Sequence, residues 1–156
     1  MTVRLRAHHL LCMLTYVGRG YSPAFTANFD RIVSRLNAGE SLLVVEGPDD
    51  ICRPLLNEQP QPHCLEARVK KRDARAATAL SRWLDLSVET GRLLHPDRKL
   101  ITRMRSAFAE GKTRQACLGC EWQSLCTRIA DNAYTESRLG DAEDPPRPSS
   151  VPARVR

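Results

Sequence analysis

The sequence predicts a small, mainly α-helical domain with at most one or two short strands and an irregular loop between two cysteines. Apolar residues recur at helical spacing in several segments, whereas only Leu42 to Val45 forms a short β-branched run. Residues 52–64 contain three prolines and no periodicity, so a loop bracketed by Cys52 and Cys64 is expected there. Helices are expected over residues 7–17, 67–85, 97–109 and 124–134, besides the helix described next.

The clearest predicted helix begins at Pro23 and ends at Gly39. Ser22 suits the N-cap, and proline suits the first helical position because its missing N–H would have no partner there. Glycine adopts the left-handed conformation that often follows a helix. One buried stripe is expected on this helix, formed by Phe25, Phe29, Ile32, Val33 and Leu36.

The chain of 156 residues has the length of a single domain. We expect this domain to span residues 1–139. The composition then changes to an acidic stretch followed by prolines and serines, which have almost nothing apolar to bury. Residues 140–156 are therefore expected to form a disordered tail.

The composition excludes a membrane-spanning protein. Apolar residues make up 42% of the chain, the net charge is +6, and no run approaches the length of about 20 apolar residues that a membrane helix needs. The apolar run Leu10 to Leu14 is too short for a signal peptide. We therefore expect a cytoplasmic protein, in which six cysteines are metal ligands or reactive thiols rather than disulfides.

Three of the cysteines form the pattern C-x2-C-x5-C at Cys117, Cys120 and Cys126. Gly119 allows the intervening loop to turn tightly, so two thiolates can face one metal centre. Three thiolates are one short of a closed zinc site or of a [4Fe–4S] cluster. Two upstream residues are candidates for the fourth ligand, and both belong to the irregular loop: Cys52 and Cys64.

His8, His9 and Cys12 form a second candidate site, which we assign to cofactor binding. His8 and Cys12 are four residues apart and share one face of a helix. They would bind one ligand or line the wall of the cluster pocket, with a histidine N–H donating to a sulfur. The alternative is that a histidine bonds a nearby backbone group and Cys12 packs in the core.

No sequence motif indicates catalysis. The chain has no Gly-rich phosphate loop, no G-x-S-x-G and no H-E-x-x-H, so enzymatic activity is not expected from motifs. Asp49 and Asp50 are adjacent in a turn, where carboxylates commonly cap the following backbone.

A basic run lies in the helix predicted after Cys64, and it could contact the phosphates of a nucleic acid. No stacking aromatics are interleaved with it, so a solvated helix face is the simpler interpretation. Its members are Arg68, Lys70, Lys71, Arg72, Arg75 and Arg82.

Taken together, these segments resemble a family of small bacterial and archaeal proteins, the family of unknown function numbered 1284, which is inferred from its cysteines to bind iron–sulfur clusters. The resemblance rests on residues 6–12, 18–21, 47–52 and 117–122 together with Cys126. It implies cluster binding by Cys52, Cys64, Cys117, Cys120 and Cys126, with His8, His9 and Cys12 as a further shared feature. The chain departs from the family at Ala7, where proline is usual, and at Leu55, where many members have another cysteine.

The leading hypothesis is a cytoplasmic protein that binds one iron–sulfur cluster, of the [4Fe–4S] type, in a redox, sensing or structural role toward an unknown protein partner. One alternative is a zinc-stapled interaction module that contacts nucleic acid through residues 68–75. A second alternative is an enzyme that uses the face formed by His8, His9 and Cys12.

Overall fold

The computed structural model describes residues 2–58 and 60–140, without the side chain of His63. It confirms a mainly α-helical domain with a small sheet. The strands are β1 (Thr2–Arg6), β2 (Ser41–Val45) and β3 (Leu93–Leu94). The α-helices are α1 (His9–Cys12), α2 (Pro23–Asn37), α3 (Arg53–Glu58), α4 (Ala67–Leu84), α5 (Arg98–Ala109) and α6 (Gln123–Asp131), and the 3₁₀ turns are η1 (Met13–Thr15), η2 (His63–Leu65) and η3 (Arg114–Cys117).

The sheet joins the N-terminal strand to the strand predicted from the run Leu42 to Val45. β1 pairs with β2 in parallel, with Thr2 opposite Ser41, and β2 pairs with β3 in antiparallel orientation. α2 lies in the connection between the two parallel strands, which need a crossover of this kind. The sheet buries alternate residues of its two longer strands in the core: Val3, Leu5, Leu42 and Val44.

The predicted helix at Pro23 is confirmed as α2. The Ser22 hydroxyl accepts a hydrogen bond from the backbone N–H of Phe25 at 3.1 Å, as an N-cap should. Gly39 has a φ of 94°, in the left-handed region that favours glycine. All five residues of the predicted stripe are buried.

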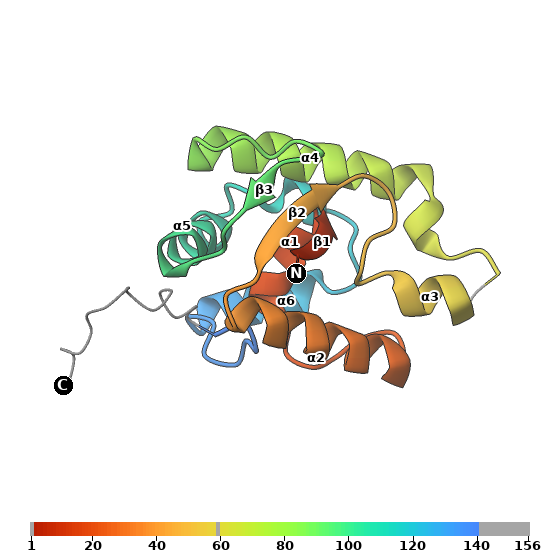
Figure 1. Cartoon of the computed structure of the whole chain (residues 1–156). Helices are drawn as coiled ribbons and strands as arrows, with labels where there is room; N and C mark the ends of the chain where they lie inside the picture. The colour runs from red at the N-terminus through yellow and green to blue at the C-terminus, as the bar shows by residue number, and fades with distance from the viewer. Residues whose placement is uncertain (1, 59, 141–156) are drawn as a thin grey trace, which may run out of the picture.

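The helices surround the sheet and bring the two ends of the described chain together. In Figure 1, α4 (green) and α2 (orange) lie on opposite sides of β1 and β2. α5 and α6 contact each other, and both contact η1, the turn that directly follows α1. The segment that carries Cys126 therefore packs against the segment that carries Cys12.

The sheet is larger than predicted, with three strands rather than at most one or two. β1 escaped prediction because Val3 and Leu5 alternate with arginines over only five residues. Their pairing partner in β2 is also distant in sequence. β3 has only two residues, too few for a detectable alternation.

Three further predictions were wrong in detail. The bracketed loop 52–64 contains α3 and η2, because the first turn of a helix tolerates a proline such as Pro54. The helix predicted over 7–17 is shorter: α1 and η1 cover only residues 9–15. The last helix stops at Asp131 rather than at 134, because Ala133 and Tyr134 adopt positive φ angles of 57° and 61°.

The boundary of the domain near Leu139 stays a prediction. Leu139 is buried, and the backbone N–H of Gly140 donates to the side chain of Asn37 at 2.9 Å. Residues 141–156, which make up the rest of the predicted tail, lie outside the described residues. Among the described helices, none combines the length and the apolar character needed to span a membrane.

Candidate metal centre

One cavity of about 110 Å³ brings together the candidate ligands of both sites that the sequence predicted. All six cysteines line it, together with His8 and His9. Six of the chain's eight Phe, Tyr and Trp residues also line it, although aromatics make up only 5% of the sequence. These aromatic residues are Tyr16, Tyr21, Phe25, Phe29, Phe108 and Trp122.

The C-terminal part of the described chain contributes three cysteines to the lining of this cavity: Cys117, Cys120 and Cys126. The loop between Cys117 and Cys120 turns tightly, as predicted. Gly119 has a φ of 79°, and the backbone N–H of Cys120 donates to the carbonyl of Cys117 at 3.0 Å. Cys126 lies in the first turn of α6, where its N–H bonds the carbonyl of Trp122 at 2.9 Å. The three cysteines therefore belong to three neighbouring segments: Cys117 to η3, Cys120 to the loop that follows it, and Cys126 to α6.

Cys12 faces these three cysteines from the N-terminal side of the cavity. Burial raises the pKa of the Cys12 thiol well above its ordinary value, and the charges of Cys126, Cys120 and Cys117 raise it further. Four ionised thiolates would repel one another strongly at this spacing unless a cation lay between them.

Donors and positive charges are directed at this group of four cysteines. The hydroxyl of Thr15 and the sulfur of Cys126 are 3.1 Å apart. Arg114 lowers the pKa of Cys117, and Arg72 lowers the pKa of both Cys12 and Cys117. Burial is the larger effect and still leaves the pKa of Cys117 and Cys126 raised, so the helix N-terminus does not by itself produce a thiolate at Cys126.

Cys52 and Cys64 form a separate pair in the same cavity. The thiols of Cys52 and Cys64 interact with each other, and both residues are only 2% exposed. The interaction with Cys52 is the main reason why the pKa of Cys64 is lowered, and the charges of His9 and Arg6 add to this effect against the opposing effect of burial. The five metal ligands predicted from the sequence thus divide into two groups.

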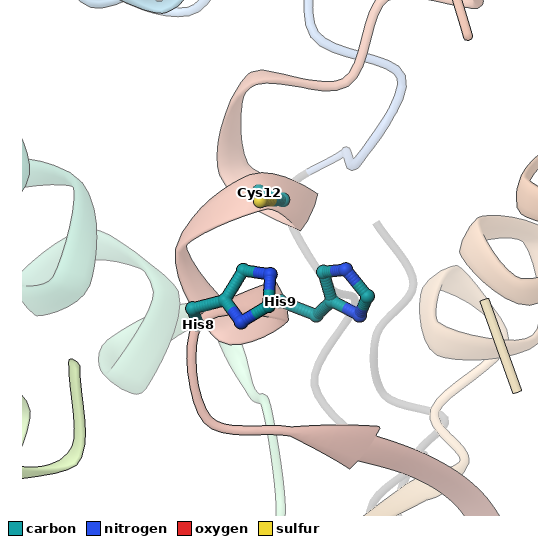
Figure 2. Close-up of side chains that lie close together, drawn as sticks. All are labelled: His8, His9 and Cys12. Atoms are coloured by element: carbon teal, nitrogen blue, oxygen red, sulfur yellow. The ribbon is translucent and has the colours of Figure 1, made fainter. Parts of the chain in front are cut away.

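Each of the two histidines is held by an aspartate. Nδ1 of His8 lies 2.6 Å from Oδ1 of Asp73, and Nδ1 of His9 lies 2.7 Å from Oδ2 of Asp49. Since an ionised carboxylate only accepts, each Nδ1 carries a proton and donates a hydrogen bond to the aspartate. Figure 2 shows the two rings beside Cys12, and one ligand atom from each of these three residues lies within 4.8 Å of the others. A carboxylate behind a histidine is the usual support of a metal-binding imidazole.

Asp49 is a structural acceptor rather than a metal ligand. Its ligand atom also lies within 4.8 Å of those of His9 and Cys52. However, Oδ1 accepts from the backbone N–H groups of Ile51 and Cys52, and Oδ2 accepts from the N–H of Arg6 and from His9. Four hydrogen bonds saturate the carboxylate, so no lone pair is left for an ion. This arrangement confirms the predicted capping role of Asp49.

Arg6 links Asp73, which holds His8, to the backbone of Cys64. The sequence analysis did not identify this residue. The residue is fully buried; its Nε donates to Asp73 at 2.8 Å and its Nη1 donates to the carbonyl of Cys64 at 2.9 Å. Burial lowers the pKa of Arg6, but Asp73 and Cys52 outweigh that effect and keep it above the ordinary value. Nothing in the sequence indicates that Arg6 and Asp73 meet, because 67 positions separate them.

The basic run does not form one uniform face of α4. Arg72 is half-buried and lines the cavity, Asp73 contacts His8, and Arg68 is paired with Glu66. The remaining members of the run on this part of the helix are exposed: Lys70, Lys71 and Arg75. Arg72 is thus part of the cavity lining rather than of an exposed surface that could contact a nucleic acid.

The buried His8 gives the protein a predictable response to acid. Burial is the main reason why the pKa of His8 is lowered to about 4, and the charge of His9 adds to it. The unfolded chain binds a proton at an ordinary histidine pKa of about 6.5, so the free energy of unfolding should fall as pH drops from about 6.5 to 4. We expect a slope of about 1.4 kcal/mol per pH unit in urea titrations.

The variant His8→Gln is the control, because it has no imidazole to protonate. Its free energy of unfolding should change far less between pH 6.5 and 4 than that of the wild-type protein. Equal slopes in the two proteins would show that His8 titrates normally in the fold.

Comparison with known proteins identifies the family but no activity. No curated protein and no solved structure matches the chain. A family model described as a protein of unknown function (DUF1284) matches residues 20–126. This range includes Cys52, Cys64 and the C-terminal trio, but it does not include His8, His9 or Cys12. Because the match covers more than half of the 156 residues, the chain belongs to the DUF1284 family.

Proposed function

We propose that the protein binds one iron–sulfur cluster, of the [4Fe–4S] type, through Cys12, Cys117, Cys120 and Cys126. The observation that carries this proposal is the convergence of these four cysteines, from opposite ends of the described chain, on one cavity. Four cysteine thiolates are the usual ligand set of such a cluster. Sequence reasoning offered Cys52 or Cys64 as the fourth ligand, and the placement of Cys12 favours Cys12 instead.

Among the described residues, the three C-terminal cysteines do not lie as close together as the ligands of a single zinc ion would. Around one tetrahedral zinc with Zn–S bonds of about 2.3 Å, the sulfurs would stand about 3.8 Å apart. In the described part of the chain, the groups of three ligand atoms within 4.8 Å of one another are His8, His9 and Cys12, and His9, Asp49 and Cys52. The cysteine trio is not among them, as expected if each sulfur binds a different iron of a cluster.

The surroundings suit a buried, negatively charged cofactor. Arg72 and Arg114 bring positive charge to the cysteines, and Thr15 offers a hydrogen bond to Cys126. Hydrogen bonds and charges of this kind, together with the exclusion of water, set the reduction potential of a cluster. The aromatic side chains that line the cavity supply that exclusion. When bound, the cluster would supply one-electron transfer, and the protein would act in a redox, sensing or structural role in the cytoplasm.

The direct test is anaerobic purification followed by a visible spectrum and by iron, sulfide and zinc analysis of the same sample. A brown protein with about four iron and four sulfide per chain is expected. A colourless protein with about one zinc would contradict the proposal and favour the zinc-stapled module.

A second candidate function is supported by the group formed by His8, His9 and Cys12. Three protein ligands, two of them backed by carboxylates, leave one coordination position of a single ion open, which is the arrangement of catalytic zinc sites. An enzyme of this kind would keep its metal in the variant Cys120→Ser and lose it in His9→Gln. The cluster proposal expects the opposite for Cys120→Ser, so metal analysis of these two variants separates the candidates.

A further inference from the structure

The four proposed cluster ligands do not include Cys52 and Cys64, so the proposed function gives these two cysteines no role. The two thiols interact with each other, and although only 2% of each residue is exposed, both line the cavity. They flank the segment 53–63, which holds α3 and η2, so a bond between them would close a short loop. Both are free thiols in the structure.

The side chains around the pair favour reaction at Cys64. Arg6 is fully buried, bonds the carbonyl of Cys64, and has one terminal nitrogen, Nη2, without a hydrogen-bond partner among the described residues. His9, supported by Asp49, also acts on Cys64 with its charge. A thiol beside cationic groups and a second thiol is the arrangement found in reactive cysteines.

We propose that Cys52 and Cys64 form an oxidisable dithiol, separate from the cluster ligands, which hydrogen peroxide converts into a disulfide. The cavity of about 110 Å³ has room for several water-sized molecules, so it admits a peroxide but not a large disulfide substrate. The exposed Arg19 and Tyr21 are part of its lining and mark where it reaches the surface.

The reaction balances without a further co-reactant. The thiolate of Cys64 attacks one oxygen of the peroxide, the O–O bond breaks, and hydroxide leaves and takes up a proton to become water. Cys64 is then a sulfenic acid. The sulfur of Cys52 displaces the second oxygen, also as water, and the S–S bond forms. In total, two thiols and one peroxide give one disulfide and two waters, with two electrons passing from sulfur to oxygen.

The test uses the full-length protein as purified, treated with one equivalent of hydrogen peroxide under nitrogen. The sample is then unfolded in iodoacetamide and digested with trypsin. Trypsin does not cut the Arg53–Pro54 bond, so Cys52 and Cys64 remain in one peptide, residues 36–68, which contains no other cysteine. Most of this peptide should have lost two hydrogens and carry no iodoacetamide label, and dithiothreitol should restore two labels.

The variant Cys52→Ser is the matched control, because it keeps the attacking sulfur and removes the resolving one. Its Cys64 should be trapped by dimedone as a sulfenic acid after the same treatment. The proposal is overturned if the wild-type peptide keeps both labels, or if Cys64 ends as a sulfinic acid without a disulfide.

Iron analysis separates this inference from the proposed function. If Cys52→Ser and Cys64→Ser lose as much iron as Cys120→Ser, the pair holds the cluster, and the dithiol inference fails while cluster binding stands. If the wild-type protein holds no iron and the disulfide still forms, the cluster proposal fails while the dithiol inference stands.

Discussion

The variant Cys12→Ser should lose its iron as completely as Cys120→Ser, with the iron content of each falling at least about tenfold below that of the wild-type protein. The hydroxyl of serine stays protonated at neutral pH and is a poor ligand for the soft iron–sulfur cluster. Cys12 lies among the charges of the other three cysteines, so its loss should leave one iron without a protein ligand. Iron and sulfide per chain, measured after anaerobic purification, check this expectation.

Cys52→Ser is the matched control for this experiment. Cys52 lines the same cavity and is as buried as a ligand would be, but its thiol interacts with Cys64 rather than with the four proposed ligands. The control variant should keep most of its iron. If Cys12→Ser retained full iron while Cys52→Ser or Cys64→Ser lost it, the fourth ligand would belong to the bracketed loop.

The variant Asp49→Ala should destabilise the fold by about 3–5 kcal/mol, because several buried donors lose their acceptor at once. The carboxylate of Asp49 accepts the backbone N–H groups of Arg6 and Ile51 at 2.7 Å and 3.0 Å, and it also holds the ring of His9. Alanine supplies no acceptor, and the side chain it replaces is fully buried. Urea unfolding at pH 7 measures the loss.

Asp50→Ala is the control, since it removes the same side chain from the next position. The carboxylate of Asp50 accepts from the backbone N–H of Arg4 and pairs with the largely exposed Arg53, and both groups can turn to water instead. Its removal should cost less than about 1 kcal/mol. Equal losses in the two variants would show that the turn, rather than the buried carboxylate, accounts for the stability.

The fold could be predicted from the sequence where the signal was local. α2 was predicted from its cap, its proline and its apolar stripe, and all of these are observed. β1 could not be predicted, because parallel pairing gives no local signal and its alternation spans only five residues. α3 was hidden by the prolines that surround it, although Pro54 lies within its first turn.

The candidate site was predictable in its residue types but not in its grouping. Each predicted cysteine and histidine lines the one cavity. The spacing could not show that Cys12 lies near the C-terminal trio while Cys52 interacts with Cys64, because both arrangements depend on packing between segments. Arg6 was missed for a similar reason: an arginine near the chain start is normally exposed, and only the distant Asp73 allows its burial.

The joining of the two ends of the described chain at the cavity has a consequence for synthesis on the ribosome. Cys12 leaves the ribosome first, and Cys126 follows more than a hundred residues later. Translation proceeds at about 5–20 residues per second, so roughly 5–20 s pass between the synthesis of Cys12 and that of Cys126. The proposed four-cysteine set therefore cannot assemble until the segment that carries Cys126 has left the ribosome.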